Sequence, residues 1–102
     1  NTDKDKVNGG LMACSLAEAL LCMGREYDEK AEELIKQAIN SDSKNQIRWS
    51  LAKDHLVYGQ ICQRQARIRD AGHNYRKAIE VFSACGASGW VKRVEKEISH
   101  LS

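Results

Sequence analysis

The sequence predicts an all-α protein, on three observations. The 102 residues include no proline, so nothing of that kind interrupts a helix. Segments rich in Ala, Glu, Lys, Leu and Arg dominate, and their apolar residues recur at helical spacing. The alternation of Val, Ile and Thr that is typical of strands is nearly absent. We therefore expect about five helices, stacked as antiparallel hairpins around one small core.

Residues 1–9 are polar and mixed in charge, and we expect a flexible tail before a single domain over 10–102. The first hairpin is predicted over 10–42. Its first helix ends at about Met23, because a glycine that can act as a C-terminal cap follows. Its second helix begins at about Asp28, where acidic side chains favour the positive end of the helix dipole. The apolar stripe of the first helix consists of Ala13, Leu16, Ala17, Leu20 and Leu21.

The second hairpin is predicted over 44–86. Its first helix runs to about Gln65 and is apolar on more than one side, so we expect an inner helix with neighbours on both flanks. Its second helix begins at about Ile68. A closing helix follows over 88–101, and Trp90 near its start is expected to pack onto the helix before it.

Small residues mark the places where helix backbones are expected to approach closely. Ala31 and Ala38 recur 40 residues later as Ala71 and Ala78, which indicates an internal repeat. Gly59 is a further small residue, on the helix opposite the second pair. We expect these side chains to let the two helices of each hairpin nest.

The spacing of the second hairpin resembles one unit of the tetratricopeptide repeat (TPR), a helix–turn–helix protein-interaction module. The residues that match are Tyr58-Gly59, Ala66, Ala71, Tyr75 and Ala78. The resemblance implies a short right-handed superhelix. A repeat of 40 residues exceeds the family's usual ~34 and falls near the ~40–47 of HEAT and armadillo repeats, so the subclass stays open.

The end of the chain resembles the close of repeat arrays in large bacterial signalling proteins. Those proteins carry an ATPase module, with a cyclase, kinase or transcription-factor domain elsewhere. The matching residues are Val81-Phe82, Gly86, Ala87 and Trp90. The polar start at Asn1 is likewise expected for a domain cut from a longer protein.

Charge and composition exclude several function classes. A net charge of +2, from 16 basic and 14 acidic residues, does not indicate a dedicated nucleic-acid binder. No apolar run approaches ~18 residues, so no membrane span is predicted. The four cysteines lie on apolar helix faces without a paired spacing, and we expect reduced, buried thiols in a cytoplasmic protein. They are Cys14, Cys22, Cys62 and Cys85.

The sequence offers little that could catalyse a reaction. It has no Gly-rich phosphate loop, no HExxH and no CxxC, so we expect no enzyme, no cofactor and no metal site. The nearest grouping is His55 and Cys62, seven residues apart on one helix face. A Cys/His enzyme is the third alternative, and the simpler interpretation is that His55 fills a packing position.

The leading hypothesis is a non-catalytic interaction or scaffold module of a larger signalling or regulatory protein. The resemblance implies that the first helices line a concave groove for a protein or peptide. Helical phase assigns that groove to Glu18, Lys53, Leu56, Gln60, Gln63 and Arg64. The alternative is an intramolecular relay beside an ATPase or DNA-binding domain.

Two further surfaces are expected to meet neighbours. The first helix can self-associate, since apolar residues there are expected to be exposed; they are Leu11, Cys14, Leu21 and Cys22. Trp49 precedes the repeat pattern and is expected to face a neighbouring repeat.

Overall fold

The computed structural model describes the backbone of residues 2–101 and the side chains of residues 13–101. No strand occurs in the part of the chain described. The all-α prediction is therefore confirmed. The elements are α1 (Thr2–Met23), the 3-10 turn η1 (Arg25–Tyr27), α2 (Asp28–Lys44), α3 (Arg48–Arg64), α4 (Ile68–Ala84) and α5 (Ser88–Ser99).

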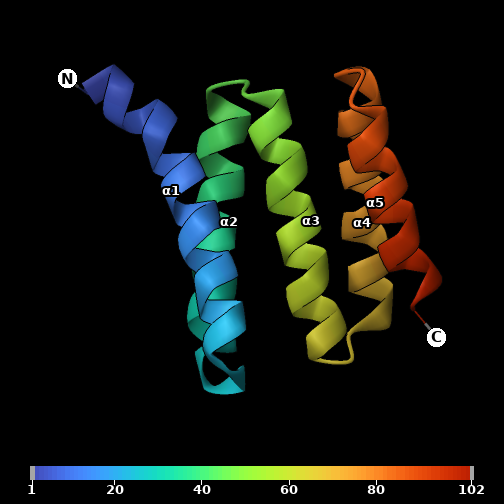
Figure 1. Ribbon diagram of the computed structural model, residues 1–102. Helices are drawn as coiled ribbons and strands as arrows, with labels where there is room; N and C mark the ends of the chain where they lie inside the picture. Colours follow the sequence, from blue (N-terminus) through green and yellow to red (C-terminus); the bar gives the residue numbers. More distant parts are fainter. Residues whose placement is uncertain (1, 102) are drawn as a thin grey trace.

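The helices form two antiparallel hairpins and a closing helix (Figure 1). α1 packs on α2 and α3 on α4; α2 then packs on α3, and α5 on α4. In the view of Figure 1, α1 and α5 lie in front of α2 and α4. Alternate helices thus lie on alternate sides, which is the arrangement of a helical stack.

The start of α1 differs from the sequence prediction. A tail was expected over residues 1–9, whereas the helical backbone begins at Thr2. The stretch contains no proline, and the pair Gly9-Gly10 lies within the helix without ending it. Side chains before residue 13, including Leu11, lie outside the described residues.

The connections after α2, α3 and α4 share one geometry, repeated at intervals of 20 residues. Gln46, Ala66 and Gly86 each have a positive φ, of 56°, 62° and 72°. In each connection the next amide donates to the carbonyl five residues earlier, which is a Schellman cap. These bonds are Ile47 to Asp42 (3.0 Å), Arg67 to Cys62 (2.8 Å) and Ala87 to Phe82 (2.9 Å).

The core consists of two clusters, one on each flank of α3. Val57 and Ile61 of α3 face α1 and α2, and Leu56 faces α4 and α5. This confirms the prediction that the third helix is buried on more than one side. The first cluster adds Cys14, Ala17, Ala31, Ile35 and Ala38; the second adds Ala52, Cys62, Ala71, Tyr75, Ala78, Phe82 and Val94.

Two predictions about buried side chains were wrong. Leu16 was assigned to the inner stripe of the first helix, yet it is 52% exposed while Ala17 is fully buried. Successive residues of a helix point about 100° apart, so both could not face α2. Cys22 and Cys85 are exposed, whereas Cys14 and Cys62 are buried. The burial of Cys14 agrees with the prediction of buried thiols but contradicts its assignment to an exposed self-association surface, because its side chain is 2% exposed.

Trp49 also lies elsewhere than expected. It was predicted to face a neighbouring repeat, but its ring contacts Phe82 of α4 and Trp90 of α5 within the same stack. Trp90 stacks on Phe82, which confirms that it packs onto the preceding helix.

Candidate interaction surface

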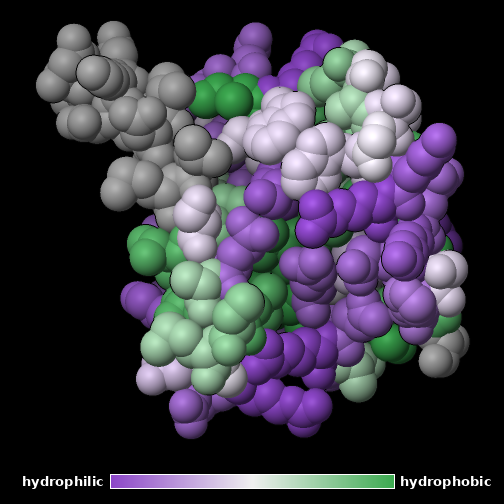
Figure 2. Space-filling model, in the orientation of Figure 1, coloured by the Kyte–Doolittle hydropathy of each residue, from purple (hydrophilic) through white to green (hydrophobic). Residues whose placement is uncertain are grey.

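Lys53 of α3 connects the three helices that share one side of the stack. Its Nζ lies 3.2 Å from Oε1 of Glu18 on α1 and 5.5 Å from the ring centroid of Trp90 on α5. The ammonium group therefore contacts a carboxylate on one neighbour and an aromatic ring on the other. We call this side, formed by α1, α3 and α5, the shared face. Figure 2 shows hydrophilic side chains across its centre and hydrophobic ones over α1 at the lower left.

Three aromatic rings meet where α3 and α5 begin. Phe82 and Trp90 stack, with centroids 5.3 Å apart and planes at 13°. Trp49 presents its edge to Trp90 at 5.6 Å and to Phe82 at 6.1 Å. Phe82 is fully buried, but Trp49 keeps 42% of its surface exposed. Arg93 places its Cζ 5.1 Å from the Trp90 centroid. We call Trp49, Trp90, Lys53 and Arg93 the aromatic–cationic patch.

Of the six residues predicted to line the groove, the structure brings together Glu18 and Lys53. Leu56 was predicted to face the groove and does not: it is 3% exposed and belongs to the core between α3 and α4. The helix buries two flanks, so its open face is narrower than helical phase alone suggested. Gln60 is half-buried on α3.

The other two predicted groove residues bind the scaffold itself. Gln63 Oε1 accepts a hydrogen bond of 2.7 Å from the hydroxyl of the buried Tyr75. Arg64 donates to the carbonyl of Leu21 and lies 3.4 Å from a carboxylate oxygen of Asp28. Both side chains therefore hold helices together, and they are less free to contact a ligand than the sequence suggested.

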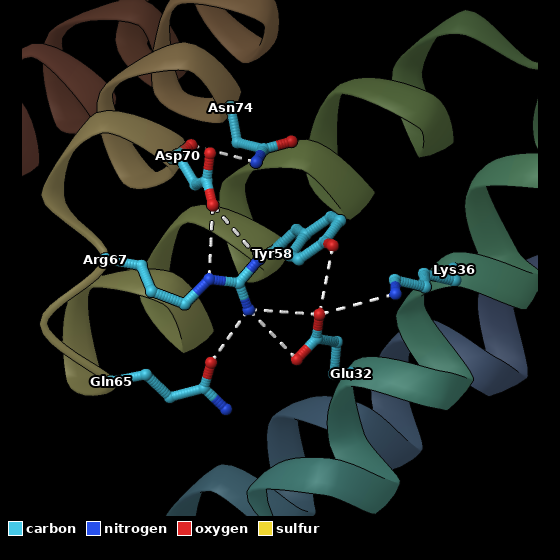
Figure 3. A network of polar contacts seen from close by, with 7 residues as sticks. All are labelled: Glu32, Lys36, Tyr58, Gln65, Arg67, Asp70 and Asn74. Carbon is cyan, nitrogen blue, oxygen red and sulfur yellow. Dashed lines mark hydrogen bonds and ion pairs between the residues drawn. The ribbon is translucent and has the colours of Figure 1, made fainter.

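A polar network ties α2 to the turn between α3 and α4 (Figure 3). Nη1 of Arg67 donates to both carboxylate oxygens of Glu32, at 3.2 and 3.1 Å, and Nε donates to Asp70 at 3.1 Å. The Tyr58 hydroxyl donates to Glu32 at 3.1 Å, and Lys36 lies 3.4 Å away. Burial alone would raise the pKa of Glu32, but hydrogen bonds from Arg67 and Tyr58 outweigh it and lower that pKa.

A cavity of about 400 Å³ lies beside this network. On one wall, Nδ1 of His55 lies 2.9 Å from Oδ1 of Asn74, whose amide nitrogen donates to the Asp70 carbonyl. The cations at the cavity, Lys36 and Arg67, already pair with Glu32, so little net charge is presented to a ligand. The lining residues are Lys36, Ile39, His55, Tyr58, Arg67, Asp70, His73 and Asn74.

The Cys/His pair considered from the sequence lacks the properties of a nucleophile and its base. Cys62 is fully buried, and burial raises the pKa of its thiol to about 11. The thiol is therefore protonated near neutral pH. His55 is directed to Asn74, and burial lowers the pKa of its imidazole. Among the described residues, no cluster of three His, Cys, Asp or Glu side chains is arranged to hold a metal ion.

Two fully buried carboxyl groups, Asp42 of α2 and Asp54 of α3, were missed from the sequence. Ser50 Oγ donates to Asp42 at 2.8 Å, while neither oxygen of Asp54 has a hydrogen-bond partner among the described residues. Burial and the neighbouring Asp42 raise the pKa of Asp54 to about 9, so this carboxyl is protonated near neutral pH. A signal was present: Asp54 lies three and seven residues before the core residues Val57 and Ile61, on their face.

Comparison with known proteins gives no relative: no family model, curated protein or solved structure matches the chain. Among the described residues, no helix is both long enough and apolar enough to cross a bilayer.

Proposed function

We propose that the chain is a non-catalytic protein–protein interaction module, a TPR-like stack that offers its shared face to a protein or peptide. In such a stack each hairpin buries its apolar side against the next, and the alternate helices leave one continuous surface. The order of small residues that resembles a TPR unit supports this, because Ala71 and Ala78 are fully buried between helices. We expect the module to act in the cytoplasm, where its free thiols stay reduced.

The contact of Lys53 with Glu18 and Trp90 is the observation that carries the proposal. One side chain reaches both neighbouring helices, so a ligand lying across Lys53 touches three helices at once. A surface of mixed charges, amides and aromatic rings suits an extended or helical peptide.

A peptide library displayed on phage tests the proposal directly. We expect the protein to select binding peptides, and Lys53→Glu to weaken the selected peptides about fivefold or more, as for loss of a contact near the centre of an interface. Lys30→Glu is the matched control, since Lys30 is exposed on α2 and its ion pair among the described residues is with Glu33 of the same helix. Failure to select any peptide, or equal effects of the two variants, would count against the proposal.

The second candidate is an intramolecular relay beside an ATPase or DNA-binding domain in a larger signalling protein. The residues near Gly86 and Trp90 that resemble the close of signalling repeat arrays favour it. The sequence of the full encoded polypeptide is the test. A neighbouring ATPase or DNA-binding domain would support the relay, and its absence would eliminate it.

A thiol assay separates either candidate from a Cys/His enzyme. We expect iodoacetamide under native conditions to modify the exposed Cys22 and Cys85 and to leave Cys62 unmodified, because Cys62 is buried and protonated. Mass spectrometry of the alkylated peptides shows which cysteines are modified and in what order. Rapid modification of Cys62 would reopen the enzymatic alternative.

A further inference from the structure

We propose that the aromatic–cationic patch is the anchoring point of the shared face, and that it takes an acidic protein segment carrying an aromatic or long aliphatic side chain. This inference rests on the proposed function, since it names the class of partner for that face. It rests on two properties of the patch, an exposed ring on a rigid base and a concentration of positive charge.

The rigid base lies under Trp49. The ring of Trp49 meets Trp90 and Phe82 edge-on, and Phe82 is fully buried in the core that includes Val94. The exposed 42% of Trp49 is therefore held by contacts that exist before any ligand arrives. A large side chain that is already fixed loses little conformational entropy on binding, and Trp is enriched among the residues that dominate interface energies. In Figure 2 the pale area near the top, over the first turns of α3 and α5, marks side chains of intermediate hydropathy.

The charge beside this ring is positive. The charged groups over Trp90, among the described residues, are the ammonium of Lys53 and the guanidinium of Arg93. Arg48, the neighbour of Trp49 in the first turn of α3, is exposed. Glu18 pairs with Lys53 but is itself 41% exposed, so an incoming carboxylate can replace it at low cost. Arg93 can bind a carboxylate through two parallel hydrogen bonds.

A single-stranded nucleic acid is another polyanion that binds exposed aromatic rings, but it fits the patch less well. Bases stack on free ring faces. Trp90 already stacks on Phe82 and lies against Lys53 and Arg93, which leaves Trp49 as the remaining platform. Nucleic-acid affinity also depends on many phosphate contacts. The chain has a net charge of only +2. A short acidic segment with one apolar side chain fits both properties.

Four synthetic probes test the inference by fluorescence titration of the intact chain at low salt. The first is a short peptide in which Glu residues flank a Phe. The second replaces each Glu by Gln, the third replaces the Phe by Ala, and the fourth is an oligothymidylate. We expect the first peptide to bind about tenfold or more tightly than either altered peptide, since it alone combines the anchor with charge pairs. Equal binding of the Gln peptide, equal binding of the Ala peptide, or stronger binding of the oligothymidylate would each overturn the inference.

Variants assign the binding to the patch. Trp49→Ala and Arg93→Gln are expected to weaken the first peptide about tenfold and about threefold, and Trp49→Phe to restore most of the affinity. Lys44→Gln, at the exposed end of α2, is the control and should change nothing. Arg93 is exposed, so its variant tests the patch even if Trp49→Ala disturbs folding.

The inference and the proposed function fail in different ways. If phage selection yields peptides that bind the shared face but ignore Trp49 and Arg93, the proposed function stands and the anchoring role of the patch is wrong. If selection yields no peptides and the acidic Phe peptide does not bind either, both are wrong.

Discussion

Gly59 of α3 lies directly against the ring of Tyr75 of α4. A Cβ atom at position 59 would stand 2.5 Å from Cε1 and 2.6 Å from Cδ1 of that ring, closer than such atoms can approach. Tyr75 is fully buried, and its hydroxyl donates to Gln63 at 2.7 Å, so a sideways displacement of the ring would break that bond. The close packing of α3 on α4 therefore depends on the absence of a side chain at position 59.

We predict that Gly59→Ala lowers the free energy of unfolding by about 1–2 kcal/mol, since overpacking of this size costs ~1–3 kcal/mol and the better helix propensity of Ala returns part of it. Urea denaturation measures the change. Gly89→Ala is the matched control, because no atom of the described residues that could clash lies within 4 Å of a Cβ there. It should stabilise α5 by up to ~1 kcal/mol. Equal and favourable effects of both substitutions would contradict the packing described.

Much of the fold could be predicted because its signals are local. The starts of α2, α4 and α5 lie where they were predicted, although no side chain caps any of the three. The small residues at 71 and 78 follow from the repeat. Leu56 was misplaced because the two buried flanks of α3 leave a narrower open face than helical phase alone indicated. Leu16 was misplaced because it points about 100° away from the buried Ala17. The pairing of Glu32 with Arg67 joins residues 35 apart, a separation at which the sequence carries no spacing rule.

Of the site, the sequence placed Glu18 and Lys53 on one face, but it predicted neither their ion pair nor the aromatic rings beside them. Trp49 looked like an outlier because it precedes the repeat pattern. Its contacts with Phe82 and Trp90 arise only when α5 folds back on α4. Asp54 was overlooked because a charged residue is normally exposed.

A pair of substitutions tests the shared turn geometry. Ala66 has φ 62°, a conformation that costs a non-glycine residue ~1 kcal/mol, so Ala66→Gly should raise the free energy of unfolding by about 0.5–1 kcal/mol. Gly86 has φ 72° in the equivalent turn, and Gly86→Ala should lower it by about 1 kcal/mol. Thermal or urea unfolding gives both values. Changes of the same sign would show that the two turns differ.

Asp54→Asn is predicted to change how stability depends on pH. The folded-state pKa of Asp54, about 9, lies above the unfolded value of ~3.9. Between these values the folded chain holds a proton that the unfolded chain has released. The stabilising contribution of Asp54 to the free energy of unfolding is therefore fully present below about pH 4. It declines as pH rises toward 9, by at most ~1.4 kcal/mol per pH unit.

Urea midpoints of the wild type and Asp54→Asn, measured from about pH 5 to pH 8, supply the comparison. The difference between them cancels the titration of Glu32 and His55, whose lowered pKa values change stability in the opposite direction. We expect the urea midpoint of Asp54→Asn to rise steadily relative to that of the wild type as pH increases. Parallel curves would mean that Asp54 is not protonated in the folded protein.

Self-association through α1 is still a prediction, but the exposed large apolar residues of the helix are Leu16 and Met23, since Cys14 is buried. Leu16 and Met23 are 52% and 60% exposed and lie seven residues apart on one side of the helix. We expect the sedimentation-derived mass to rise with concentration, and Leu16→Glu to abolish the rise because it places a charge on the apolar face. Ile68→Glu, at an exposed apolar position on α4, should leave the rise intact. A wild type that stays monomeric at high concentration would rule this contact out.

Because the turns after α2, α3 and α4 are alike, the direction of a helix and the side on which it lies both alternate along the chain. Each interval of 20 residues reverses the direction of the chain and moves the next helix to the other side. Deleting or duplicating one interval would preserve every turn, yet would send all later helices to the wrong side and invert their polarity. Two intervals restore both. A stack of this kind can therefore lengthen by pairs of helices while its shared face stays aligned.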